Sequence, residues 1–318
     1  KTAALTNAGA LSNQGTVTVG VDDTGYDVKF FGATSGAYML WDESADDLML
    51  VGAAGLSVAG EISTPSAGTS NVRFGVNAGN SIASGGNYNV VVGDEAGTAL
   101  TTGDGNVAIG FEALSTEDAN GNNTAIGYQA LKVLNAGATG ENTAVGYQAG
   151  KAVTTGLYNS IFGTNAGDAL TNADFNTALG TSALGQDTLG SRSTAVGYTA
   201  LYSQNFTTAT DSYNTAVGHA AGYGMSTAVY NTLVGGLAGD ALSTGGYNVA
   251  IGGSSLTTED TGRKNVAVGA YTLGSQNADV DNFNTAVGYY AGGAVTTGVE
   301  NTLIGGLAGD ALTDADYN

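Results

Sequence analysis

The chain has 318 residues, of which 52 are Gly, one is Pro and none is Cys, and its formal net charge is −20. Gly without a strict three-residue period excludes collagen, and the lack of Cys excludes disulfides and thiolate metal sites. The negative charge disfavours nucleic acid and anionic membrane surfaces as partners, and no apolar run is long enough to predict membrane insertion.

Residues 1–62 predict a small β-strand module, because short apolar runs alternate with Gly, Asp and Ser turns. The runs are TVTVGV (16–21), YDVKFFG (26–32), AYMLW (37–41), DLMLVG (47–52) and GLSVAGEI (55–62). Residues 25–52 resemble a small β-module of virion appendage proteins, particularly those of marine phages. Phe30, Phe31, Tyr38, Met39 and Trp41, the only Trp, suffice for a small core or for one shared between subunits.

A module of this size is hardly stable alone, so we expect trimeric neighbours to help bury it. Residues 63–70, STPSAGTS with the sole Pro65, predict a hinge into the segment that follows.

Residues 71–318 repeat the pattern N-[TVS]-x-[apolar]-G, mostly at a spacing of 17 residues and elsewhere of 18, 19 or 21. A short fixed period of this kind predicts a solenoid. If one repeat makes one coil with a rise of about 4.8 Å, fourteen coils extend over roughly 67 Å, although a coil of two repeats stays open. The repeats begin at Asn71, Asn89, Asn106, Asn123, Asn142, Asn159, Asn176, Ser193, Asn214, Asn231, Asn248, Asn265, Asn284 and Asn301, and Asn318 begins another.

The columns of the repeat predict a β-coil rather than a helix, since Gly, Asn and β-branched residues are poor helix formers. Position 5 is always Gly, which predicts a corner with positive φ or a close backbone approach. Positions 2 and 4 share one strand face, and position 3, mostly Ala, lies on the other. The Asn at position 1 predicts a hydrogen-bonded ladder, and the Ala at position 8 a place where coils or neighbouring chains approach closely.

A longer period of four repeats is superimposed on the first, because position 9 is Gly in two successive repeats and Leu in the next two throughout. Position 12 is apolar in the Gly repeats and polar in five of the six Leu repeats. A packed interior has room for one such side chain, so we expect the core to be filled alternately from these two positions. The columns themselves give no reason for the pairs.

The segments NTAIGYQAL, NTAVGYQAG and NTALGTSAL resemble the repeats of tail-fibre-type proteins of bacteriophages and related bacterial surface proteins. They are more distantly similar to the head repeats of trimeric autotransporter adhesins, which share the Asn-Ser/Thr start and the Val/Ile-Gly corner. The resemblance covers residues 71–318 and implies a homotrimer of parallel β-rolls forming a rigid shaft. The 17-residue unit is longer than that of the adhesin heads, so the phage-type interpretation comes first.

Residues suited to catalysis are few. His219, the only His, stands at position 6, where other repeats have Tyr, so it is most simply a surface variant. A Ser-His-Asp triad would have to use it, and a multi-His zinc site within one chain is impossible. Paired acids that could cleave a glycan are Asp22/Asp23, Asp46/Asp47, Glu117/Asp118 and Glu259/Asp260.

The last two acidic pairs occupy equivalent positions of the repeat, which favours a solvated acidic arm over one unique active site. Arg192, Arg263 and Lys264 are expected to pair at the surface with Asp187 or with Glu259/Asp260. DVDN (279–282) and DADYN (314–318) are weak calcium candidates. The aromatic residues that end eight repeats could stack on sugars, although packing on the neighbouring coil is the commoner role. They are Tyr88, Tyr158, Phe175, Tyr213, Tyr230, Tyr247, Phe283 and Tyr317.

The sequence therefore predicts an all-β protein, a trimeric parallel β-solenoid or β-roll of about fourteen 17-residue repeats (71–318) after a small β-module (1–62) and a hinge (63–70). The expected function is the structural shaft of a virion tail fibre that projects a host-receptor-binding tip, with no cofactor and no catalytic, metal or known ligand site in this segment. Expected partners are further copies of the chain, other virion tail proteins, and a host glycan or protein bound through other regions. The alternatives are a bacterial surface adhesin or extracellular filament at the cell surface, and a glycan-cleaving tailspike.

Overall fold

The computed structural model describes residues 28–31, 37–42, 47–51, 67–137 and 140–318. The chain divides into two compact units, Lys1–Ser63 and Thr64–Asn318, and each is considered by itself. The strands predicted at 16–21 and 55–62, and residues 63–66 of the predicted hinge, lie outside the described residues.

The first unit contains a three-stranded antiparallel sheet in the order β1 (Val28–Phe31), β2 (Tyr38–Asp42) and β3 (Asp47–Val51). Phe30 lies opposite Met39, which in turn lies opposite Leu50. The three central runs predicted from the sequence are therefore strands, and they pair with their nearest neighbours along the chain.

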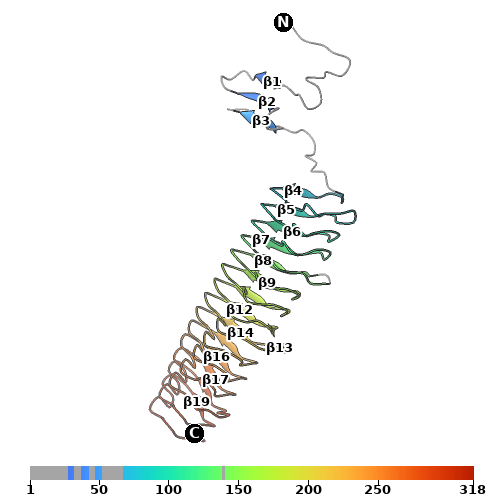
Figure 1. Cartoon of the computed structure of the whole chain (residues 1–318). Coiled ribbons are helices and arrows are strands. Elements are labelled where there is room, and N and C mark those ends of the chain that lie inside the picture. Colours follow the sequence, from blue (N-terminus) through green and yellow to red (C-terminus); the bar gives the residue numbers. More distant parts are fainter. Residues whose placement is uncertain (1–27, 32–36, 43–46, 52–66, 138–139) are drawn as a thin grey trace, which may run out of the picture. The chain divides into compact units, whose positions relative to one another are not determined.

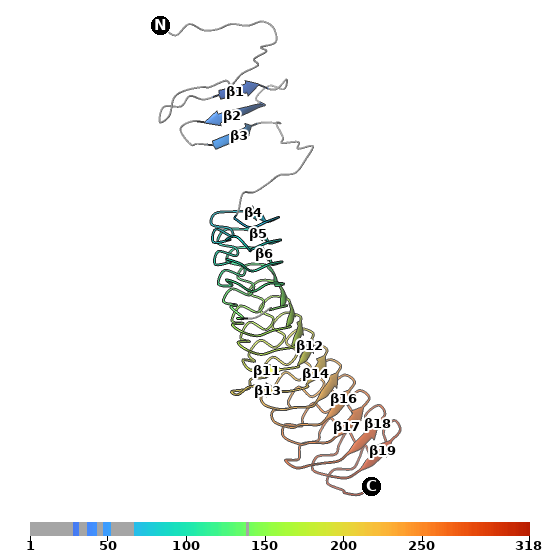
Figure 2. The ribbon, with the colours of Figure 1, turned by 90° about the vertical axis from the view of Figure 1, so that its right-hand side faces the viewer.

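The second unit is a solenoid whose fourteen parallel strands form one sheet, with each coil stacked on the next (Figures 1 and 2). Equivalent residues of successive repeats lie opposite each other, as Thr177 does Thr194, so one coil holds one repeat. The strands are β4 (Val72–Phe74), β5 (Val90–Val92), β6 (Val107–Ile109), β7 (Thr124–Ile126), β8 (Thr143–Val145), β9 (Ser160–Phe162), β10 (Thr177–Leu179), β12 (Thr194–Val196), β14 (Thr215–Val217), β15 (Thr232–Val234), β16 (Val249–Ile251), β17 (Val266–Val268), β18 (Thr285–Val287) and β19 (Thr302–Ile304). The longest repeat adds β13 (Thr210–Asp211), which pairs in parallel with β11 (Gly190–Ser191) of the preceding repeat.

Each strand ends after three residues because the Gly at position 5 turns the backbone. All fourteen of these glycines have φ between +126° and +145°, a region that L side chains rarely adopt. A Cβ on Gly235 would lie 2.5 Å from the carbonyl oxygen of Gly252 in the next coil. Both reasons predicted from the sequence for this invariant Gly therefore hold.

The interior of the solenoid is narrow and is lined by small residues. The residues at position 3, such as Ala178, and the Ala at position 8, such as Ala183, are fully buried. The Ala column at position 8 therefore faces the inside of a single chain rather than a neighbouring one. Of the two interpretations that the sequence left open, the structure supports coil-to-coil packing.

The remaining core space is filled from two alternative positions, as predicted. In the Leu coils, position-9 residues such as Leu201 are fully buried. In the Gly coils the space is taken by position 12, since a Cβ on Gly239 would lie 2.8 Å from Cδ1 of Leu242. A side chain at position 9 of a Gly coil would therefore compete with position 12 for space, whereas the longer coil of Asn123 buries both Leu131 and Leu134.

The glycines come in pairs because of position 3 in the second coil of each pair. There the inward strand residue is large (Val91, Ile161, Leu233 or Leu303) instead of Ala. A Cβ on Gly222, in the preceding coil, would lie 2.8 Å from Cδ1 of Leu233, and one on Gly239, in the same coil, 2.8 Å from its Cδ2. One large side chain thus fills the core beside two successive glycines.

The Asn at position 1 forms the predicted ladder inside the solenoid. The Oδ1 of Asn142 accepts a hydrogen bond from the backbone N–H of Asn159 in the next coil at 2.9 Å. The Nδ2 of Asn142 donates to the carbonyl oxygen of Gly156 at 2.8 Å. The ladder satisfies backbone groups at the start of most strands and is interrupted after Ser193 and after Asn265, whose side-chain amide has no partner among the described residues.

Candidate functional site

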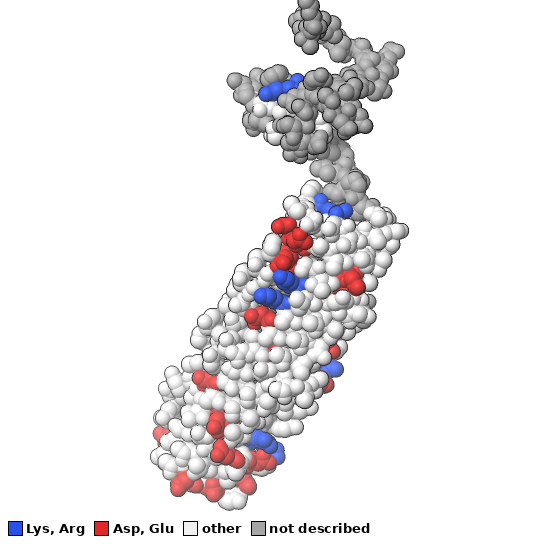
Figure 3. Space-filling model, in the orientation of Figure 1, with Lys and Arg blue, Asp and Glu red and all other residues white. Residues whose placement is uncertain are grey.

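The outward face of the solenoid sheet is formed by positions 2 and 4 and carries no charged residue, in a chain with 28 acidic and 8 basic residues. Position 2 is Val, Thr or Ser, and position 4 is Val, Ile, Leu or Phe in every strand. Phe74, Leu179 and Ile304 are 51%, 47% and 70% exposed. On the face drawn in Figure 3, charged side chains are scattered and uncharged surface extends between them. Such a continuous apolar strip is typical of a surface covered by another chain.

The three-stranded sheet of the first unit also presents apolar side chains to solvent. Phe30, Met39, Trp41, Leu48 and Leu50 are all exposed. The strand register brings them to one face, because Phe30, Met39 and Leu50 are cross-strand neighbours and so are Trp41 and Leu48. Of the residues noted in the sequence, Phe30, Met39 and Trp41 thus lie on one exposed face, and Tyr38 lies on the other face of the sheet.

Three carboxylates lie inside the solenoid, which overturns the prediction of a solvated acidic arm. Glu117, Asp187 and Glu259 are fully buried, whereas Asp118 is exposed and Asp260 half-buried. All three buried acids stand at position 12, in the first of two successive Leu coils. Position 12 faces inward in every coil, and in Leu coils the Leu at position 9 already fills the apolar space.

Hydrogen bonds from within the chain surround these carboxylates. Glu259 accepts from the backbone N–H of Gly262 at 2.7 Å and from Nδ2 of Asn282 at 2.9 Å. Asp187 accepts from the N–H of Gly190 at 3.0 Å. Burial raises the pKa of Glu117, Asp187 and Glu259, and the hydrogen bonds act in the opposite direction. Their oxygens are thus engaged inside the core.

The second Leu coil extends the network around Asp187. Gln204, at position 12 of that coil, donates through Nε2 to Asp187 at 2.5 Å and to Oγ of Ser193 at 2.8 Å. Its Oε1 accepts from Nδ2 of Asn214 at 2.9 Å. The sequence did not predict this network. The available signal was a polar residue in a column that is otherwise apolar.

The other predicted charge partners differ from the expectation. Arg192 forms an ion pair with Asp211 at 3.0 Å, and Lys264 with Asp281 at 2.7 Å. The prediction of pairs with Asp187 or Glu259 was wrong because those carboxylates face inward. Asp22, Asp23 and Asp46 lie outside the described residues, so their pairs form no site that the structure describes.

The weak calcium candidates are engaged in hydrogen bonds and an ion pair. Asp279 accepts from the hydroxyl of Thr261 at 2.5 Å, and Asp281 pairs with Lys264. Asp316 accepts from the backbone N–H of Val299 at 2.8 Å. Over the described part of the chain, no group of three or more His, Asp or Glu residues could hold a metal ion.

Five of the eight aromatic residues that end the repeats stack on one another between coils, namely Tyr158, Phe175, Tyr213, Tyr230 and Tyr247. The ring of Tyr230 lies 5.3 Å from that of Tyr213 and 5.0 Å from that of Tyr247, nearly parallel to both. Arg192 continues the column, with its guanidinium 4.7 Å from the ring of Phe175. Packing on the neighbouring coil is thus confirmed for these residues, and because their ring faces are covered, this part of the column cannot stack on a sugar.

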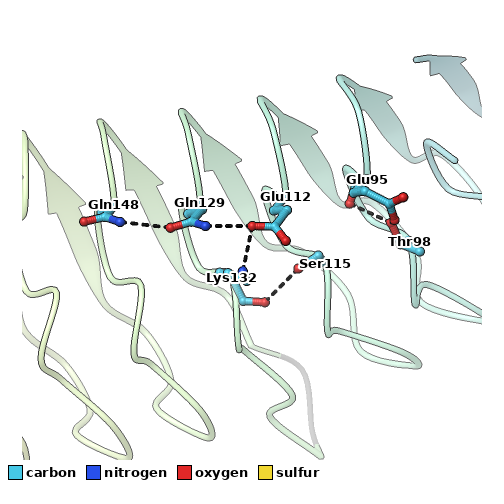
Figure 4. A network of polar contacts seen from close by, with 7 residues as sticks. All are labelled: Glu95, Thr98, Glu112, Ser115, Gln129, Lys132 and Gln148. Atoms are coloured by element: carbon cyan, nitrogen blue, oxygen red, sulfur yellow. Dashed lines mark hydrogen bonds and ion pairs between the residues drawn. The ribbon is translucent and has the colours of Figure 1, made fainter. Parts of the chain in front are cut away.

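Positions 7 and 10 carry a polar network in the earlier coils (Figure 4). Gln148 donates to Gln129 at 2.9 Å, and Gln129 donates to Glu112 at 2.6 Å. Lys132 forms an ion pair with the same carboxylate at 2.6 Å. The hydrogen bonds from Lys132 and Gln129 lower the pKa of Glu112. We call these four residues the Glu112 network.

The same face differs further along the solenoid, around His219. His219 is exposed, and its ring stacks on that of Tyr198 with the centroids 5.4 Å apart. Both residues line a depression of about 470 Å³, together with Tyr202, Tyr223 and Asp240. We call this depression the tyrosine groove.

No protein-family model, curated protein or solved structure matches this chain. In the part of the chain that the structure describes, no helix is long and apolar enough to cross a membrane. The chain is a β-solenoid of about fourteen coils preceded by a small antiparallel sheet, and its function must be inferred from the surfaces and the core described above.

Proposed function

We propose that this segment is the structural, non-enzymatic shaft of a virion tail fibre, which projects a host-binding tip carried by other regions. The observation that carries the proposal is the unbroken register of the solenoid sheet. Fourteen strands pair in sequence without a break in their order, and the insertions of the longer repeats stay outside this sheet. Backbone hydrogen bonds tie each coil to the next and the Asn ladder reinforces most of these steps, so the repetition yields length and stiffness.

The buried acids support a structural role rather than glycan cleavage. A retaining or inverting glycosidase needs two carboxyl groups facing a substrate across a cleft. Glu117 and Glu259 instead face the interior, each with hydrogen bonds from its own chain. Their repetition at position 12 is explained by packing, with no need for a substrate.

We further propose that the working unit is a homotrimer whose chains meet through the outward sheet faces. A strip of Val, Ile, Leu and Phe along the whole solenoid would be costly to leave in water. A chain of net charge −20 repels its own copies elsewhere, so the uncharged strip is the surface on which copies can approach. The exposed face of the first sheet, with Phe30 and Trp41, favours the same assembly.

The resemblance to phage tail-fibre repeats and to virion appendage modules is what favours a virion over a cell surface. An antibody against this chain should label the tail appendages of particles that carry it in electron micrographs. Labelling of a cell surface without virions would favour the adhesin alternative.

The homotrimer is tested by the mass of the full chain in sedimentation. We expect three times the mass of one chain, and a loss of assembly when Val145→Asp and Val217→Asp place charges on the outward face. Thr155→Asp, at an exposed position of the same repeat as Val145 but outside the sheet, is the matched control and should leave the trimer intact. A stable monomer of the unmodified chain would refute the assembly.

A further inference from the structure

The tyrosine groove has two aromatic walls that stand side by side. At position 6, Tyr198 and His219 stack with an interplanar angle of 18°. At position 10, Tyr202 and Tyr223 stack 5.4 Å apart with an angle of 11°. Position 10 is aromatic in these two repeats alone, so the repeat pattern departs from its own average at this place.

The ring of His219 has one face that no neighbouring coil covers. The next two residues of its column are Gly236 and Gly253. A Cβ on Gly236 would meet nothing closer than the carbonyl oxygen of His219, at 4.0 Å. By contrast, the ring of Tyr128 has a stacked ring on each side. The position-6 column therefore ends at His219 with space for one further ring.

The floor of the groove carries short uncharged side chains where the earlier coils carry long polar ones, and it begins at Ser182. Position 7 is Thr199, Ala220 and Leu237 in the three coils beneath the walls, and all three line the depression. In the Glu112 network the same column consists of linked polar side chains (Figure 4). The floor of the groove is thus uncharged, and it is apolar at Ala220 and Leu237, next to the open face of His219.

Asp240 closes the position-10 wall next to the open space. It follows Tyr223 in the column and lies in the same coil as Gly236. One carboxylate oxygen, Oδ1, accepts a hydrogen bond from the hydroxyl of Thr257. The contact fixes the carboxylate, and its second oxygen, Oδ2, accepts no hydrogen bond from the described side chains.

We propose that the tyrosine groove binds a neutral hexopyranose unit of a glycan. The C–H face of the pyranose ring stacks on the open face of His219 and takes the place of the missing position-6 side chain. Asp240 accepts hydrogen bonds from sugar hydroxyls, and the tyrosine hydroxyl groups donate or accept at the rim. A concave, largely apolar site with a few polar groups is the usual form of a small-molecule site.

Charge selects the class of sugar. No Lys or Arg lines the groove, and Asp240 together with the net charge of −20 repels carboxylated or sulfated glycans. A quaternary ammonium ion is typically held by several aromatic ring faces at once. Here the stacked rings cover one another, and the position-6 column leaves the face of His219 open. The inference goes beyond the proposed shaft, and its failure would leave the shaft intact.

The experiment uses the full chain with its single His labelled with ¹⁵N and ¹³C. His219 then gives the only imidazole signal, so its chemical shift reports directly on the stacking face. Maltohexaose, cellohexaose and mannohexaose are titrated separately, with oligogalacturonate and choline chloride as the anionic and cationic probes. We expect at least one neutral oligosaccharide to move the His219 signal saturably at millimolar concentration, and neither charged probe to do so.

Two variants test the geometry. Gly236→Tyr fills the stacking place with a ring and should abolish the sugar-induced shift. Gly306→Tyr is the matched control at position 6 of the last coil and should bind as the unmodified chain does. Asp240→Asn should weaken binding about tenfold, the effect of one charge-assisted hydrogen bond. The proposal is overturned if none of the three sugars moves the signal, if Gly236→Tyr responds unchanged, or if choline alone binds.

Discussion

The Gly coils and the Leu coils of the solenoid share one backbone but fill its interior differently. In Leu coils a position-9 Leu occupies the centre, and position 12 carries an acid or amide in five of six cases. In Gly coils position 12 is apolar, and the strand of the second coil adds a large inward residue such as Leu233. The difference shows that the volume of the core, rather than any one residue, is what the repeat keeps constant.

This choice has consequences outside the core. Where Leu fills the centre, position 12 can be polar, and it then holds buried networks such as that of Asp187 and Gln204. Where Gly stands at position 9, position 12 is hydrophobic and the coil needs no such network. The three longest repeats are all Leu coils, and two of them carry a Gln at position 12, Gln204 and Gln276.

The largest loss of stability is expected when the position-9 Leu of a Leu coil is placed into a Gly coil. In Gly239→Leu the new side chain enters space that Leu233 and Leu242 already occupy. Because four heavy atoms are added rather than one, we expect a loss of about 4 kcal/mol or more, above ordinary overpacking. Chemical denaturation at equal protein concentration measures the loss.

Two further variants decide whether volume is the cause. Gly253→Leu, at an open position 6 in the next coil, should change stability little. Gly239→Leu combined with Leu242→Ala should recover part of the loss. If the double variant is no more stable than Gly239→Leu alone, competition for core volume is not the reason for the alternation.

The reverse change should cost somewhat less. Leu201→Ala empties the centre of a Leu coil, where the side chain is fully buried. Deleting a buried Leu side chain costs about 3 kcal/mol, including the cavity that remains. Leu237→Ala, a position that is 40% exposed, is the control and should lie within about 0.5 kcal/mol of the unmodified chain. Equal losses in the two variants would contradict the assignment of Leu201 to the core.

The sequence predicted most of the solenoid because every coil repeats the same requirement. An invariant Gly such as Gly235 must mark a backbone constraint, and a column of Asn such as Asn142 must share one environment in all coils. The alternation of positions 9 and 12 was visible for the same reason. Repetition acts here as many independent observations of one local structure.

What the sequence could not predict depends on which side of a strand faces inward. Positions 3 and 4 are both apolar, and only the structure shows that Ala178 faces the core while Leu179 faces solvent. The prediction for the acids was wrong for a related reason. Glu117 and Asp118 are adjacent and alike, yet one points into the coil and the other out. The pairing of Gly coils depends on Leu233 reaching two coils at once, which no single column records.

Removing the charge of a buried acid should have a moderate effect. Glu259 accepts hydrogen bonds from the backbone N–H of Gly262 and from Nδ2 of Asn282. In Glu259→Gln the amide NH₂ replaces one accepting oxygen, so one of these donors loses its partner and the NH₂ group gains none. We expect a loss of about 2 kcal/mol in the free energy of unfolding, measured by chemical denaturation. Asp118→Asn changes the exposed acid of the equivalent pair Glu117/Asp118. It should change the free energy of unfolding by less than about 0.5 kcal/mol. A stabilised Glu259→Gln variant would mean that burial of the charge outweighs its hydrogen bonds.

The smallest expected effect is the response of the Leu coils to mild acid. Burial raises the pKa of Glu117, Asp187 and Glu259 in the folded state, whereas the unfolded chain has ordinary values of about 4. As the pH falls from neutral toward those values, the folded state therefore binds protons that the unfolded chain does not, and the free energy of unfolding rises.

Protonation of the exposed acids also raises the stability of the folded chain on acidification, because a lower net charge reduces repulsion. The difference between two chains isolates the buried groups. The unmodified chain should gain more in Tm between pH 7 and pH 5 than a variant carrying Glu117→Gln, Asp187→Asn and Glu259→Gln, with about 2–4 °C for each kcal/mol. Parallel curves would mean that these carboxylates keep ordinary pKa values despite burial, so that their hydrogen bonds fully offset the loss of water. The ionised carboxylates of the Leu coils would then be as stable in the folded state as in the unfolded chain.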